Sequence, residues 1–246
     1  MPSSRRSRAI EVLLISFLFV CAAVCPAYGQ KKRVPPGGNL SVVADERLAA
    51  LRVAPNLSAR LIQRLSRGRL VSVRSSNRSR DGVSFTYVAV TKRTLGWIQS
   101  EALFSAARRG DDQRLAHLLS ANDEFDRVAR ARIFLDTFPR SPLRPKVLLL
   151  LGDAAEEAAA KLSRESERRF ERREIPTDGA PEFSYFLNYS GLDRYNRQGV
   201  TFIFDPATKR FHYDGAAWRE IVRRYKDSLE AGEARKRLAD LTARAQ

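Results

Sequence analysis

Residues 40–103 alternate between apolar and polar positions, which is the period of strands with one buried face. The clearest runs are "VSFTYVAV" at 83–90 and "TLGWIQ" at 94–99. Polar segments rich in turn-forming residues, such as "SNRSRDG" at 76–82, lie between the runs. Four or five short strands of this kind predict a small closed or nearly closed β-barrel.

From Phe104 onward the apolar spacing changes to three and four, which is the period of amphipathic helices. Pro139 and Pro142 end one such helix, and the next runs from Val147 into the charged segment "RESERRFERRE". The apolar stripe of a later helix contains Trp218, Ile221, Val222 and Tyr225. The predicted fold class is therefore multi-domain α+β, with the barrel over residues 40–103 and a helical domain over 104–246.

Residues 174–214 interrupt the helical pattern and hold nine of the chain's 22 aromatic residues: Phe183, Tyr185, Phe186, Tyr189, Tyr195, Phe202, Phe204, Phe211 and Tyr213. Within this insertion, "TFIFDPATKRFHYDG" at 201–215 predicts a β-hairpin. The aromatic residues either pack against the helices or form an exposed surface for a protein or glycan. Packing is favoured because an isolated hairpin must bury one face to be stable.

An internal repeat is visible in the helical domain at a constant offset of 87 positions. "IFLDTFPRSPLRPKVLLLLGD" aligns with "EIVRRYKDSLEAGEARKRLAD", so that Phe138 matches Tyr225, Ser141 matches Ser228 and Leu151 matches Leu238. An aromatic residue, a turn with serine and a second amphipathic helix are similar to a tetratricopeptide helical hairpin. That resemblance implies two hairpins, separated by the insertion, that bind another protein.

Residues 1–29 have the pattern of a secretory signal peptide. Arginines precede an apolar run of residues 12–24, and small residues precede a cut between Gly29 and Gln30. An uncleaved anchor is the alternative; a lipid anchor is rejected because Val20 and Val24 precede the cysteines. Residues 30–39 read as a linker, and the mature protein is expected outside the cytoplasm, in the periplasm or secreted. No stable membrane span is expected after cleavage.

The net charge of the chain indicates which kinds of molecule it can bind. The chain carries a formal charge of +16, yet only eight of its 44 basic residues are lysines. Many of the arginines alternate with glutamates along helices, which is typical of a solvated face. For an exported protein, anionic wall polymers, envelope proteins and lipid headgroups are the available partners, and nucleic acid is not expected.

The order of motifs in the strand region resembles the bacterial SH3-type domain family over about 65 residues. Three motifs carry the resemblance: Leu51–Val53 with Pro55, Leu65 with Gly68, and Gly96–Ile98. It implies an SH3-like barrel that contacts cell-wall peptide or a protein partner. Phe85 departs from the pattern, because many relatives have a tryptophan there.

Three aromatic residues are the candidate ligand contacts: Trp97, Phe85 and Tyr87. For Trp97 the favoured interpretation is that it closes the core of the barrel, with Gly96 allowing a close backbone approach, and contact with a ligand at the barrel rim is the second interpretation.

No catalytic constellation stands out. His117 and His212 are the only histidines, and neither has the spacing of a metal site. The carboxylates near residues 101–124 are better explained as helix caps than as an acid–base pair. The expectation is a non-enzymatic binding or scaffold protein with no cofactor and no metal; the alternative is a cell-wall hydrolase or its targeting subunit.

Overall fold

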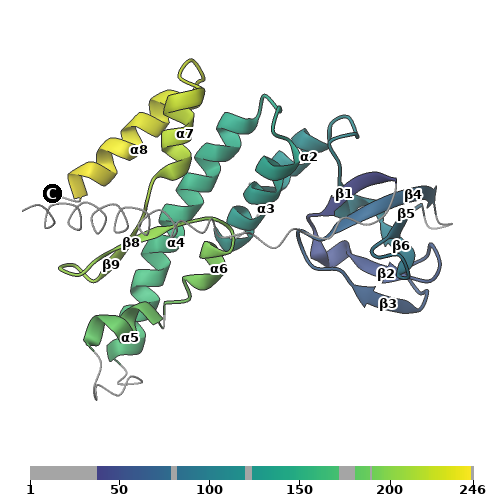
Figure 1. Cartoon of the computed structure of the whole chain (residues 1–246), viewed down its shortest axis with the longest axis horizontal. Coiled ribbons are helices and arrows are strands. Elements are labelled where there is room, and N and C mark those ends of the chain that lie inside the picture. Colours follow the sequence, from purple (N-terminus) through teal and green to yellow (C-terminus); the bar gives the residue numbers. More distant parts are fainter. Residues whose placement is uncertain (1–37, 79–81, 120–123, 172–180, 189, 245–246) are drawn as a thin grey trace, which may run out of the picture. The chain divides into compact units, whose positions relative to one another are not determined.

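The structure is a computed structural model that describes residues 38–78, 82–119, 124–171, 181–188 and 190–244. The expected signal peptide, its cleavage point at Gly29 and Gln30, and the linker up to residue 37 lie outside the described residues. Within those residues the protein is mixed α+β (Figure 1).

Seven antiparallel strands form one sheet: β1 (Asn39–Val43), β2 (Ala50–Arg52), β3 (Leu61–Arg64), β4 (Leu70–Arg78), β5 (Ser84–Ala89), β6 (Leu95–Gln99) and β7 (Leu103–Phe104). Their order is β3-β2-β6-β5-β4-β1-β7. Two short 3₁₀ helices, η1 (Glu46–Leu48) and η2 (Ser100–Ala102), connect strands. Among the described residues β3 and β7 are the two ends of this order, so the closed or nearly closed barrel expected from the sequence is shown only as one antiparallel sheet without closure.

Alternation along the strands builds the core of the sheet. One face contributes fully buried side chains that pack together, including Leu51, Val71, Val88 and Ile98. Gly96 permits β6 to lie close to its neighbours, because a Cβ there would be 2.8 Å from the Arg52 carbonyl oxygen and 2.9 Å from Leu51 Cγ. The close backbone approach expected at Gly96 is therefore confirmed.

Seven α-helices follow the sheet in the described part of the chain: α2 (Asp111–Leu119), α3 (Glu124–Thr137), α4 (Arg144–Glu171), α5 (Glu182–Asn188), α6 (Asp193–Asn196), α7 (Ala216–Arg224) and α8 (Glu230–Arg244). Strands β8 (Phe202–Asp205) and β9 (Arg210–Tyr213) form the hairpin predicted between α6 and α7. Helix α4 is the longest and contacts α3, α5, α7, α8 and β9 (Figure 1).

The 87-residue repeat is reproduced in the backbone hydrogen bonds of two helix–turn–helix units, α3–α4 and α7–α8. In the first turn, Phe138 N donates to Phe134 O at 2.8 Å and Ser141 N donates to Phe138 O at 3.2 Å. In the second, Tyr225 N donates to Ile221 O at 2.8 Å and Ser228 N donates to Tyr225 O at 2.9 Å. Every donor and acceptor is shifted by the same 87 positions, so the two turns have the same local structure.

The two units pack through a glycine in the middle of α4. A Cβ at Gly152 would lie 2.2 Å from Trp218 Nε1 and 2.5 Å from Trp218 Cε2. Only a residue without a side chain lets the buried indole of α7 lie against the α4 backbone. The equivalent position in the second unit is Ala239, which is exposed.

The aromatic insertion packs on α4, as favoured from the sequence. Phe186, Tyr195, Phe211 and Tyr213 are buried in the same core as the helices. The backbone of β9 is held by α4 side chains, because Phe211 N donates to Ser163 Oγ at 2.8 Å and Tyr213 N donates to Glu156 Oε2 at 2.9 Å. The strand edge that faces α4 thus has hydrogen-bond partners without a further strand.

Two polar clusters join the sheet to the helices. Buried Asp111, at the start of α2, accepts from Ser105 N at 2.8 Å and from Arg108 Nε at 2.7 Å. Asp126 of α3 pairs with Arg67 at 2.7 Å and with the buried Arg130 at 3.7 Å. Arg130 also donates to the carbonyl oxygen of Ala44, the residue after β1, at 3.4 Å, so its buried guanidinium contacts both α3 and the end of a sheet strand.

Replacing Gly152 by alanine should destabilise the protein by about 1–3 kcal/mol, because the new methyl group overlaps the Trp218 indole. Gly232 of α8 is the matched control, since a Cβ there meets nothing within 4 Å. Gly232→Ala should raise stability by about 0.5–1 kcal/mol through helix propensity. Urea unfolding of both variants measures these values, and a Gly152→Ala protein as stable as the wild type would contradict the packing.

Removing the carboxylate of Asp126 should cost on the order of 3 kcal/mol, because Asp126→Ala leaves the buried Arg130 charge without its acidic partner. Asp136 is the control: it pairs with Arg132 at 3.3 Å, but both side chains are about half exposed. Asp136→Ala should change the unfolding free energy by less than about 1 kcal/mol. Equal losses in the two variants would show that the Asp126 cluster does not join sheet and helices.

Candidate functional site

The face of the sheet opposite its core carries a row of side chains that crosses five strands. The residues opposite one another are Leu61, Arg52, Trp97, Tyr87 and Ser75, on β3, β2, β6, β5 and β4 in turn. All five are partly or fully exposed. We call this set the outer row. It exists because alternation sends Val88 and Ile98 into the core and their neighbours Tyr87 and Trp97 outward.

Tyr87 and Trp97 form the centre of the outer row. Their ring centroids are 5.1 Å apart and their planes meet at 45°. Such a pair offers a wide apolar surface with a hydroxyl and an indole N–H at its margins, the usual composition of a recognition surface. Two of the three candidate ligand contacts are therefore adjacent and reachable from solvent.

Phe85, the third candidate, is fully buried, with 0% of its surface exposed. The 3₁₀ helix η2 contacts β5 at this end, where Thr86 Oγ1 and Ser100 Oγ are 2.8 Å apart. Phe85 presents no surface to a ligand, and we leave it out of the candidate site.

Arg52 lies between Trp97 and Leu61 and orders the loop that follows β2. Its Nη1 donates to the Ala59 carbonyl oxygen at 2.7 Å. This bond holds the 53–60 segment beside the outer row, so a cationic side chain and an ordered loop border the aromatic pair on the β3 side.

Exposed apolar side chains gather at the same end of the sheet. Among the described residues, nine large hydrophobic side chains are exposed, and five of them lie on β3, on β6 or in the loop before β3: Val53, Leu57, Leu61, Ile62 and Leu95. We call these five residues the β3 patch. They lie on both faces of the sheet, since Leu61 and Ile62 are consecutive on β3.

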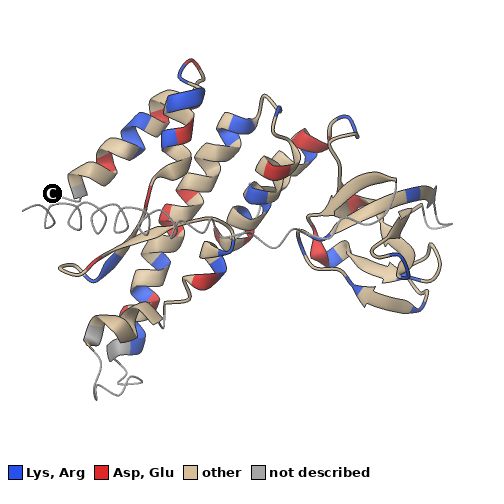
Figure 2. Ribbon diagram, in the orientation of Figure 1, with Lys and Arg blue, Asp and Glu red and all other residues tan. Residues whose placement is uncertain are grey.

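The sheet region is also basic. Residues 40–103 hold eleven Lys and Arg and four Asp and Glu. Figure 2 shows Lys and Arg on several turns of the sheet. Two of the acidic groups are already paired, Asp45 with Arg47 at 2.8 Å and Glu46 with Arg67 at 3.4 Å. An anionic partner is therefore attracted to this region.

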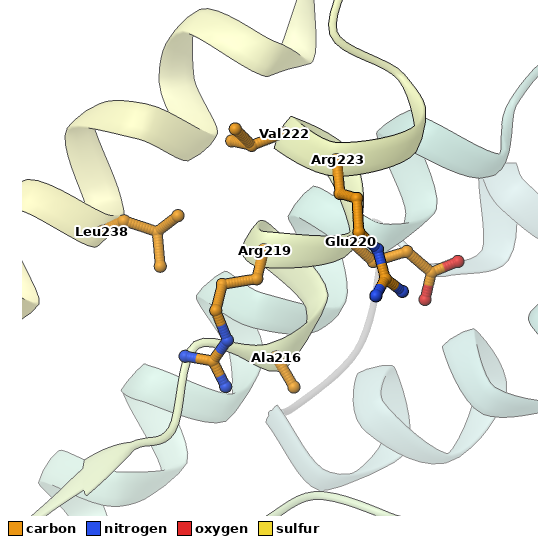
Figure 3. A pocket seen from close by; sticks show the side chains of 6 residues that line it. All are labelled: Ala216, Arg219, Glu220, Val222, Arg223 and Leu238. Carbon is orange, nitrogen blue, oxygen red and sulfur yellow. The ribbon is translucent and has the colours of Figure 1, made fainter.

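A second concavity of about 590 Å³ lies between α7 and α8 (Figure 3). Its lining combines apolar and charged side chains: Ala216, Arg219, Glu220, Val222, Arg223 and Leu238. Arg219 pairs with Asp214 at 3.6 Å, and Glu220 pairs with Arg144 at 3.1 Å. The sequence gives no signal for this hollow, because Val222 and Leu238 have the spacing of core residues.

The carboxylates singled out near the sheet–helix boundary have structural partners. Asp111 accepts the hydrogen bonds described above, and Asp112 accepts from Ser141 Oγ at 2.7 Å. Burial raises the pKa of Glu124, but the hydrogen bond from Lys161 Nζ at 2.6 Å, a backbone hydrogen bond and the positive charges of Lys161 and Arg194 together outweigh burial, and the pKa is lowered. Glu124 is thus a charged partner of Lys161 that ties α3 to α4.

The two histidines lie apart from this group. His117 is exposed on α2, and His212 Nδ1 is 3.6 Å from Glu156 Oε1. No group of three or more His, Cys, Asp and Glu side chains is arranged to hold a metal ion in the part of the chain that the structure describes.

Fluorescence quenching distinguishes the two tryptophans of the chain, Trp97 and Trp218. Trp218 is 1% exposed, whereas Trp97 is partly open to solvent. In a Trp218→Phe protein, acrylamide should quench the remaining fluorescence several times more strongly than in a Trp97→Phe protein. Circular dichroism checks that each variant is folded, and equal quenching would contradict the outer position of Trp97.

Across the described ranges, no helix combines the length and apolar character needed to cross a bilayer. No family model, no curated protein and no solved structure matches this chain.

Proposed function

We propose that this chain is an exported, non-enzymatic binding or scaffold protein of the bacterial envelope, located in the periplasm or secreted. Its sheet serves as an SH3-like module that contacts cell-wall peptide or an envelope protein, and its tetratricopeptide-like hairpins hold a second protein. The leader pattern of residues 1–29 supports export. The matched turns of α3–α4 and α7–α8 support the tetratricopeptide likeness.

The outer row is the observation that carries this proposal. Tyr87 and Trp97 lie side by side, with Arg52 and Leu61 next to them in register. Both rings are partly open to solvent, and aromatic and arginine side chains dominate binding energy at interfaces. Binding by these four side chains requires no catalytic group.

The hollow between α7 and α8 supports a second binding surface. It lies on the second repeat, and its lining combines the apolar side chains of Ala216, Val222 and Leu238 with two arginines and a glutamate. A hydrophobic side chain of a protein partner, with a carboxylate nearby, suits this lining.

Co-sedimentation with purified cell-wall sacculi tests the proposal. At about 0.5 M salt, which screens exposed charges beyond a few ångströms, the protein should still pellet with the wall. Trp97→Ala should lower the affinity roughly 30-fold, the effect of losing about 2 kcal/mol at a central aromatic contact. Phe183→Ala is the matched control, because Phe183 is an exposed aromatic residue of α5, 54% exposed.

Pelleting that disappears in high salt, or that Phe183→Ala weakens as much as Trp97→Ala, would contradict wall recognition by the outer row. Zymography on the same wall material tests the alternative function. If the purified protein produces a cleared zone, the chain is a hydrolase.

A further inference from the structure

We infer that the free edge of β3 binds an extended acidic peptide, which joins the sheet as an added strand. This inference deepens the proposed function, on which it rests, because it states the chemistry of the partner that the sheet recognises.

The position of β3 in the sheet is the first observation. β3 is the last strand of the order and pairs with β2 only, through Ala50 with Arg64, Leu51 with Gln63 and Arg52 with Leu61. All four of its residues are exposed. Among the described residues no other segment pairs with it, so one edge of its backbone is available to another chain.

The two ends of the sheet differ in how they are covered. At the other end, β7 has only two residues, both buried, and α2 lies against it. Arg114 of α2 donates to the Leu103 carbonyl oxygen, and its guanidinium lies 4.0 Å from the Phe104 ring centre. β3 has no such cover in the described part. Its own protection against pairing consists of its short length, the charge of Arg64 and a register shift opposite Leu51 and Arg52; it has no proline.

The side chains around β3 define an apolar surface for an added strand. Leu61 and Ile62 are 43% and 39% exposed, and Leu57 and Val53 extend the β3 patch into the preceding loop. Neighbouring strands place their side chains in register on each face. Every second side chain of an added strand would therefore lie on the face of the outer row. The one beside Leu61, at the end of that row, would be apolar.

Charge selects an acidic occupant over a second copy of this chain. Arg60 and Arg64 are exposed at the two ends of β3, and no ion pair to either one is found among the described residues. Two copies joined edge to edge would bring these arginines together, and like charges facing each other are destabilising. Through their partners Arg52 and Ala50, Leu61 and Arg64 lie on the same face of the sheet, whereas Arg60 lies on the opposite face. A segment that combines carboxylates with apolar residues therefore offers partners to an arginine and to an exposed apolar side chain.

The test uses a fluorescein-labelled peptide of about eight residues that alternates Glu and Val, read by fluorescence anisotropy with the purified full chain. Two further peptides carry N-methyl groups on the odd or on the even backbone amides. A strand points alternate backbone N–H groups toward its neighbour, and an N-methyl group removes the hydrogen that the N–H would donate. Methylation of the set that faces β3 should therefore weaken binding at least about tenfold, and methylation of the other set should change it little. A peptide with Lys in place of Glu should not bind.

Arg64→Glu should weaken binding of the Glu peptide at least about fivefold, whereas Arg109→Glu, an equal charge change at another exposed arginine, should weaken it less than about twofold. Equal effects of the two methylated sets, equal binding of the Lys peptide, or no binding of the Glu peptide would overturn the inference. If the peptide fails while Trp97-dependent wall pelleting persists, the proposed function stands and only the strand-addition mode is wrong. Loss of both would remove the proposed function as well.

Discussion

The contact between Gly152 and the Trp218 indole is the constraint on which the helical part depends. It lets α7 approach the α4 backbone, and the second repeat is thereby placed against the first. The same helix holds β9 through Ser163 and Glu156 on other turns. One long helix thus organises both repeats and the insertion between them.

The sheet is joined to the helices on one side only. One of its faces and one of its edges remain uncovered by described residues. The Asp111 and Asp126 clusters and the shared apolar core fix the β1 and β7 side against α2 and α3. The outer row and β3 lie away from these contacts. Substitutions at Trp97 or Arg64 are therefore expected to leave the contacts between the sheet and the helices intact, so that the proposed binding can be tested in folded protein.

Local patterns in the sequence predicted the features that are set by residues close together in the chain, namely the strands, the hairpin and the helix–helix turns. Alternation indicated the strands, "DPAT" indicated the β8–β9 hairpin, and the offset of 87 indicated two equivalent turns. Pairings distant in sequence were not predictable in this way. Phe85 has the same parity on β5 as Tyr87, yet Phe85 is fully buried, and alternation along β5 does not predict this difference. The edge position of β3 follows from the strand order, and no single segment encodes it.

Hydrogen exchange of the protein with and without solubilised wall fragments tests the central claim, which is recognition by the open side of the sheet. The backbone amides of β3, β5 and β6 should exchange more slowly in the bound state, while those of α7 and α8 should be unchanged. Slower exchange confined to the helices, or no change anywhere in the sheet, would contradict the account and assign wall contact to another part of the chain.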